Sequence, residues 1–156
     1  MSGVHPEQRL AELGRSLPDV ATPAGAYVPA VRSGSLVWTA GQIPVVDGQL
    51  AGTGKLGAQL SVEQGQELAR ICVLNALAAV KAEIGDLAKV RRVVKVVGFV
   101  ASEPTFTDQP LVVNGASELL GEVFGDAGKH ARSAVGVAVL PRDVPVEVEL
   151  VVEVED

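Results

Sequence analysis

The last quarter of the chain contains an arginine and a glutamate that could act together on a small charged ligand. Arg132 precedes an apolar stretch, and Glu147 follows the turn Pro141-Arg-Asp-Val-Pro145. A guanidinium gives a carboxylate two parallel, charge-assisted hydrogen bonds, which a lysine does not reproduce. A nearby carboxylate could then orient or deprotonate a water molecule. The alternative is that Arg132 is a solvated residue at a strand end and that Glu147 belongs to a solvated strand face.

The strands that would position this pair are predicted to form the final hairpin of the fold. Residues 133–140 and 146–154 flank the proline-containing turn, so we expect them to pair with each other. The second range has a period of two, with aliphatic side chains on one face and mostly glutamates on the other. We therefore expect Glu147 to lie across the hairpin from the strand that follows Arg132.

Two further strand regions lie upstream. Residues 27–32 and 35–40 flank a Ser-Gly pair, which predicts a second hairpin. Residues 92–101 are dense in valine, which indicates a strand covered on both faces. Gly98 interrupts this strand, and we interpret it as a β-bulge.

The clearest helix runs from about Val62 to Ile84. Ser61 and Gln64 have the spacing of a capping box at its start, and Gly85 stands where a C-terminal cap belongs. Leucines, valines and small residues along it form a broad apolar face that could pack closely on a sheet. Residues 111–124 predict a second helix of the same kind.

Composition excludes several classes of protein. The 156 residues are 47% hydrophobic but only 3% aromatic, which favours helices packed on a sheet through aliphatic side chains. The net charge of −6 disfavours nucleic acid as a partner, because neutralising phosphates supplies most of that affinity. Cys72 is the only cysteine, so no intramolecular disulfide forms, and we expect it in the core.

The residues indicate no metal site, no cofactor and no association with a membrane. His5 and His130 are far apart, and neither has a partner at metal-ligand spacing. His130 could line a site near Arg132 or be a solvated loop residue. The N-terminus is polar, and no apolar run approaches the ~18 residues of a transmembrane helix. We therefore expect a cytoplasmic protein that does not associate with a membrane.

Two separated motifs resemble the Rid family (reactive intermediate deaminases, also called YjgF-like or L-PSP proteins). The first runs from Ala26 to Val45 and contains Tyr27 and the run Ala-Gly-Gln-Ile-Pro. The second is Arg-Ser-x-Val-x-Val-x-x-Leu-Pro-x-Asp-Val-x-Val-Glu-Val-Glu, which starts at Arg132. Both occur in the family's order, and the resemblance covers roughly residues 24–154.

The resemblance implies a fold and an assembly. We expect an α+β, chorismate-mutase-like domain with a mostly antiparallel sheet and two helices on one face. The family forms homotrimers with ligand clefts between subunits. We take residues 1–156 as a single Rid-like domain, in which residues 1–23 are an N-terminal extension with a loop and a short helix that ends at Gly14.

The resemblance also assigns roles to residues of this chain. The predicted catalytic residues are Arg132, as the carboxylate clamp, and Glu147, as the acid acting on water. The predicted substrate-binding residues are Tyr27, Gly41, Asn114 and Ala134. Asn114 matches with a spacing to Arg132 that is one residue longer than in the family. Ala134 stands where better-known relatives have Cys, and Ala40 stands where they have Ser.

Three functions follow from the resemblance. The first is hydrolysis of a reactive imine or enamine, such as 2-aminoacrylate, to a 2-oxo acid and ammonia, with no cofactor. The alternative is a binding module that holds a small carboxylate metabolite, such as a 2-oxo acid, and performs no chemistry. The missing hydroxyl at Ala40 favours this alternative, because the cleft has one hydrogen-bonding group fewer. A third possibility is deamination of a larger or cyclic amine.

Overall fold

A five-stranded sheet forms one layer of the protein, whose computed structural model describes residues 3–156. Its strand order is β1-β2-β7-β5-β6, in which β5 and β6 are parallel and all other neighbours are antiparallel. The strand bounds are Ala30–Ser33 (β1), Leu36–Thr39 (β2), Val90–Ala101 (β5), Ala131–Val137 (β6) and Val146–Val154 (β7). Val45–Val46 (β3) and Gln49–Leu50 (β4) form a separate two-stranded ribbon.

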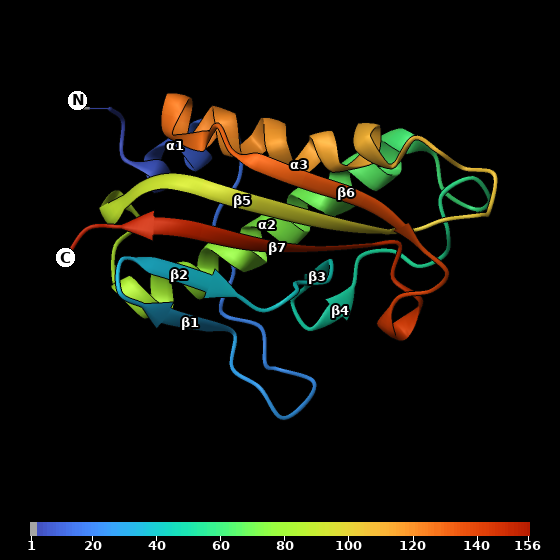
Figure 1. Ribbon diagram of the computed structural model, residues 1–156, viewed down its shortest axis with the longest axis horizontal. Helices are drawn as coiled ribbons and strands as arrows, with labels where there is room; N and C mark the ends of the chain where they lie inside the picture. Colours follow the sequence, from blue (N-terminus) through green and yellow to red (C-terminus); the bar gives the residue numbers. More distant parts are fainter. Residues whose placement is uncertain (1–2) are drawn as a thin grey trace.

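Helices form the second layer (Figure 1). Their bounds are Pro6–Glu12 (α1), Val62–Ile84 (α2) and Gln109–Phe124 (α3), with 3-10 turns at Leu87–Lys89, Gly125–Gly128 and Pro141–Asp143. The capping box of α2 is confirmed, since Ser61 and Gln64 each accept the other's backbone N–H. Gly85 ends that helix with a φ of 86°. The predicted α+β architecture with two long helices on one face of the sheet is therefore confirmed.

The N-terminal segment packs on the helices. Leu10 of α1 is fully buried in the core. Glu7 and Lys81 of α2 form an ion pair at 2.8 Å, and the side chain of Arg9 donates to the carbonyl of Glu122 in α3 at 2.9 Å. These contacts join the extension to both long helices.

The period of two in β7 decides which residues face the helices. Its alternate aliphatic residues are buried in the core, from Val146 to Val154. Glu147, Glu149, Val151 and Glu153 therefore lie on the opposite face of the sheet. Cys72 of α2 is fully buried against this layer, as expected. Burial raises the pKa of its thiol, and the charge of Glu147 raises it further.

The predicted hairpin of 133–140 with 146–154 is wrong. β5 lies between β6 and β7 and pairs with both. The turn after β6 therefore crosses over β5 instead of reversing the chain onto an adjacent strand. The alternation of apolar residues correctly predicted the faces of β7, but it carries no information on which strand is the neighbour.

Gly98 does not mark a β-bulge. The irregularities of β5 lie between Val90 and Arg92 and between Val93 and Lys95. At Gly98 a Cβ atom would be 2.6 Å from a methyl carbon of Val113 in α3. Glycine stands there because the helix approaches the strand too closely for any side chain.

The sheet face away from the helices carries an apolar surface, here called the open face. Trp38 pairs with Val31 and Val151, and Phe99 pairs with Val135. Val31, Trp38 and Val135 are 52%, 51% and 42% exposed. An apolar surface of this extent is typical of a surface that another subunit covers.

We predict that this face is a subunit interface of the homotrimer that the sequence resemblance implies. Light scattering should report about three times the chain mass of 16.1 kDa. Val135→Glu should break the trimer, because it would bury a carboxylate without a partner. Val4→Glu changes an equally exposed valine outside the sheet and should leave the trimer intact. A monomer at micromolar concentration would contradict the assembly.

Candidate functional site

Arg132 is held by α3 at the edge of the sheet. Its Nη1 donates to Asn114 Oδ1 at 2.8 Å and to Ser117 Oγ at 3.2 Å, and its Nη2 donates to the carbonyl of Pro110 at 3.4 Å. Within residues 3–156 no protein atom accepts from Nε, and no carboxylate forms an ion pair with this guanidinium. The side of the fork that contains Nε therefore remains free for a ligand carboxylate.

His130 belongs to the same cluster, through Ser117. The ring Nε2 lies 2.9 Å from Ser117 Oγ, and Nδ1 lies 2.6 Å from the carbonyl of Gly128. A carbonyl only accepts, so Nδ1 carries a proton, and in the neutral ring Nε2 accepts from the Ser117 hydroxyl. With this assignment the hydroxyl oxygen of Ser117 has its lone pairs free to accept the hydrogen bond from Arg132. His130 is partly buried and bonded at both nitrogens, so it is not a solvated loop residue.

Ser117 was not predicted from the sequence as a site residue. Asn114 and Ser117 are three residues apart on α3, and residues at this spacing lie on the same side of a helix. Helical periodicity would have found Ser117 if it had been applied to polar residues around Asn114.

Glu147 forms a second cluster with Gly41. A Cβ atom at Gly41 would be 2.6 Å from Glu147 Oε2, so only glycine leaves room for the carboxylate. Partial burial raises the pKa of Glu147, and the neighbouring charge of Glu149 raises it further. Main-chain bonds between Gln42 and Val148, at 2.8 and 3.0 Å, attach the segment after Gly41 to β7. This arrangement gives a half-buried carboxylate that is more basic than an ordinary glutamate.

The two clusters lie on opposite faces of the sheet. Arg132 pairs with Val96, which is fully buried under the helices, whereas Glu147 pairs with Phe99 on the open face. Ala134 pairs with Gly98 and packs toward α3, on the side of Arg132. β5 lies between β6, which carries Arg132, and β7, which carries Glu147. A single chain therefore brings Arg132, Asn114 and Ala134 together on one face of the sheet, and Gly41 and Glu147 together on the other. No side chain can rotate through the sheet to join them.

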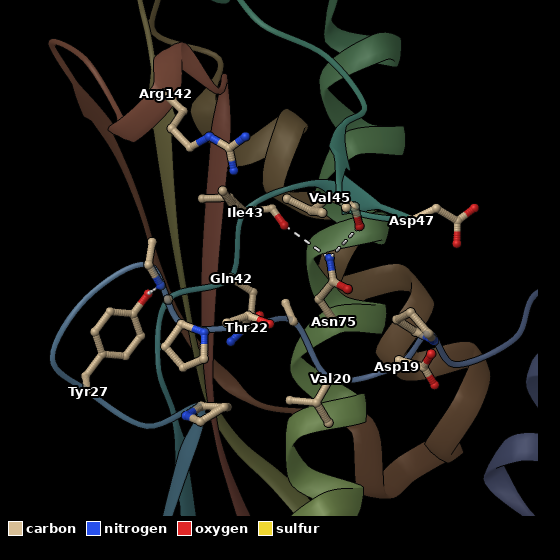
Figure 2. A pocket seen from close by; sticks show the side chains of 17 residues that line it. Asp19, Val20, Thr22, Tyr27, Gln42, Ile43, Val45, Asp47, Asn75 and Arg142 are labelled. Atoms are coloured by element: carbon tan, nitrogen blue, oxygen red, sulfur yellow. Dashed lines mark hydrogen bonds between the residues drawn. The ribbon is translucent and has the colours of Figure 1, made fainter.

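Tyr27 lies near the second cluster. Its hydroxyl accepts from the backbone N–H of Ala24 at 3.2 Å, which closes a tight loop before β1. Tyr27 and Gly41 line the same cavity, of about 480 Å³ (Figure 2). The cavity lies between the segment 18–29 and the segment 41–48. Arg142, which the sequence analysis did not single out, lies at its rim.

Two further features are absent from the described part of the chain. Among residues 3–156 no three His, Cys, Asp or Glu side chains gather as metal ligands would. In the same range no helix combines the length and the apolarity that a membrane span needs.

Comparisons with known proteins place the chain in a family. Residues 7–154 match the family described as "YjgF/chorismate mutase-like, putative endoribonuclease". The chain is 48% identical over 148 residues to Protein TCP17 of Trypanosoma cruzi, covering 94% of this chain and 92% of that one. It is 34% identical over 127 residues to a 2-iminobutanoate/2-iminopropanoate deaminase of Salmonella typhimurium, covering 81% and 86%.

A solved structure gives the same result for the fold. The Atu1372 protein of Agrobacterium tumefaciens superposes with a TM-score of 0.90 at 47% identity. The match covers 97% of this chain and 92% of that chain. The expected chorismate-mutase-like fold is thus confirmed.

Proposed function

Because the chain belongs to the YjgF/chorismate mutase-like family, we propose that it hydrolyses carboxylate-bearing imines and enamines to 2-oxo acids and ammonia. The observation that carries this proposal is the pair of complementary half-sites: a guanidinium with a free edge, and a half-buried carboxylate of raised pKa. Membership among the Rid-type deaminases is part of the proposal. It is supported by the two sequence motifs and by the Salmonella relative.

The assembly that we propose is a homotrimer in the cytoplasm. Arg132 and Glu147 cannot meet within one chain, so a site that needs both must take one from each of two chains. The apolar open face, on which Glu147 lies, supports a subunit contact next to this carboxylate. The ligand would then lie between subunits.

The proposed reaction needs only water and these side chains. The free edge of Arg132 would bind the substrate carboxylate and draw electron density from the adjacent imine carbon. Glu147 would take a proton from a water molecule while the oxygen of that water bonds to the imine carbon. The proton that Glu147 takes then passes to the imine nitrogen, which gives a neutral carbinolamine. The C–N bond of the carbinolamine breaks as its hydroxyl proton is transferred to the nitrogen, so that ammonia leaves and the carbonyl of the 2-oxo acid forms. A raised pKa makes Glu147 a stronger base near neutral pH.

A binding module remains the second candidate. Ala40 and Ala134 replace a hydroxyl and a thiol of better-known relatives, which leaves the cleft with fewer polar groups while the clamp of Arg132 is complete. Ammonia release from freshly generated imino acids decides between the two functions. We expect release by the wild type and little by Arg132→Ala. Binding of 2-oxo acids without ammonia release would favour the module.

We predict that RNA is not a substrate, although the family description includes endoribonucleases. The net charge is −6, and the half-site with Glu147 and Glu149 on the open face would repel phosphates. Nuclease-free protein should neither shift nor cut RNA at physiological salt. Saturable cutting that a Glu147→Gln substitution abolishes would contradict this expectation.

A further inference from the structure

The cavity beside Gly41 is separate from the two half-sites of the proposed reaction. It lies between the segments 18–29 and 41–48, on the side of α2. Neither Arg132 nor Glu147 lines it. The carboxylate of Glu147 lies beyond the main chain of Gly41, on the open face of the sheet. The cavity is therefore a candidate binding site of its own.

The wall of the cavity contains a buried amide with a free acceptor. Asn75 of α2 is 3% exposed, and its Nδ2 donates to the carbonyls of Ile43 and Val45 at 3.1 and 3.0 Å. Carbonyls only accept, so the nitrogen faces them and the oxygen Oδ1 faces away. Within residues 3–156 no donor reaches this oxygen, and no unpartnered side-chain oxygen or nitrogen is sealed from solvent. The Asn75 oxygen therefore opens onto the cavity that Asn75 lines (Figure 2).

A second buried amide lines the same cavity. Gln42 is 8% exposed, and its Nε2 donates to the carbonyl of Ala40 at 3.4 Å. No donor in the described part of the chain reaches the Gln42 oxygen. A buried acceptor without a donor costs free energy. Two such oxygens in one cavity therefore favour a ligand that donates hydrogen bonds.

The charges around the cavity select a cation. Asp19 and Asp47 line it, and neither forms an ion pair among residues 3–156. Figure 2 shows both on the side toward which the Asn75 oxygen points, with Arg142 at the opposite rim. A positively charged group with several N–H donors would be attracted to the aspartate end and repelled from the Arg142 end.

A strap of residues 16–23 covers the cavity. These residues exchange no hydrogen bond with the rest of the described chain. Pro18, Val20 and Pro23 of the strap line the cavity and give it an apolar wall. A segment that is held by packing alone opens at a low cost in free energy, so a small ligand can enter under the strap.

We propose that this cavity binds a small primary ammonium ion that carries a short alkyl chain. The ammonium group donates to the side-chain oxygens of Asn75 and Gln42 and lies beside the carboxylates of Asp19 and Asp47. The alkyl chain packs on the apolar wall under the strap. This site is independent of the proposed hydrolysis, because neither of the two predicted catalytic residues takes part in it.

Binding of n-butylammonium tests the inference, with 1-butanol as its uncharged analogue. The chain contains only two asparagines, Asn75 and Asn114, so protein labelled with ¹⁵N in asparagine side chains gives two amide signals. Asn114→Gln removes one of them and thereby assigns both. In the wild type n-butylammonium should shift the Asn75 signal in a saturable way and leave the Asn114 signal, beside Arg132, in place. 1-Butanol should bind about 10- to 100-fold more weakly, because its hydrogen bonds are not assisted by a charge.

Variants of the two exposed aspartates complete the test, since replacing Asn75 would also free two carbonyls. Asp19→Asn and Asp47→Asn keep the shape of the side chain, and asparagine tolerates the left-handed backbone of Asp47, with a φ of 51°. Each should weaken n-butylammonium binding about two- to fivefold, the usual effect of an exposed charge pair. Glu83→Gln removes an exposed carboxylate elsewhere on α2 and should bind as wild type does.

Three results would overturn the inference. The first is an Asn75 signal that n-butylammonium does not shift, which would mean that the cavity holds water only. The second is equal affinity for n-butylammonium and 1-butanol. The third is wild-type affinity in both aspartate variants. Each of them would leave the proposed hydrolysis untouched, because ammonia release from imino acids is measured without the amine.

Discussion

Replacing Glu147 by Gln should lower turnover of an imine substrate by about 100- to 10,000-fold, the usual contribution of a general base. Gln keeps the shape of the side chain against Gly41 and cannot take a proton from water. Binding of 2-oxo acids should change little, because the Arg132 clamp is intact. The measurement is initial ammonia release at saturating substrate, with a 2-oxo acid titration alongside.

The matched control is Glu153→Gln, on the same strand and the same face of the sheet. It removes an equal charge without touching Gly41, and turnover should persist. Turnover by Glu147→Gln equal to that of the control would reduce Glu147 to an ordinary strand residue.

The raised pKa of Glu147 gives this prediction a pH signature. Only the carboxylate accepts a proton, so wild-type turnover should fall as pH drops through a pKa above the ordinary glutamate value. Because the folded chain holds this proton more tightly than the unfolded chain, the ionised group lowers stability near neutral pH. The Gln variant should therefore melt no lower than wild type, which separates a catalytic loss from misfolding.

Replacing Arg132 by Lys should weaken binding of 2-oxo acids by about 10- to 100-fold, or roughly 1.5–3 kcal/mol. Lysine keeps the charge but has one nitrogen. It cannot donate to Asn114 and Ser117 and at the same time present a second edge to the ligand. Titration of 2-oxobutanoate into both proteins is the measurement, with light scattering to show that the assembly is retained.

Arg91→Lys is the matched control, since it makes the same exchange at an exposed position on β5 and should bind as wild type does. Equal affinities for Arg132→Lys and wild type would show that Arg132 is a surface residue. The proposed function would then lose the group that recognises its substrate.

Local signals in the sequence predicted local structure well. The capping box and Gly85 placed both ends of α2, because a cap depends on residues within one turn. The neighbour of β7 was predicted wrongly, because strand pairing depends on contacts far apart in sequence. β5 lies between β6 and β7, and its parallel pairing with β6 has no local turn signal in the sequence.

The site shows the same division between local and long-range information. Resemblance supplied Arg132 and Glu147, but it could not show that these two residues lie on opposite faces of the sheet. His130 and Ser117 become part of the Arg132 cluster only when α3 packs beside β6. Arg142 has a left-handed backbone, with a φ of 58°, and the residue after it accepts a hydrogen bond from Gly54, some 90 positions away in sequence.

The placement of Arg132 and Glu147 on opposite faces of the sheet has a consequence for trimers that contain two different variants. If each site takes its arginine from one subunit and its glutamate from the next, two inactive variants can repair each other. Trimers refolded from equal amounts of Arg132→Ala and Glu147→Gln chains would contain intact sites where a chain of one kind follows a chain of the other. Random mixing in a cyclic trimer gives about a quarter of the sites both wild-type groups. Activity should therefore return to about that fraction of the wild-type value, although each parent alone has little.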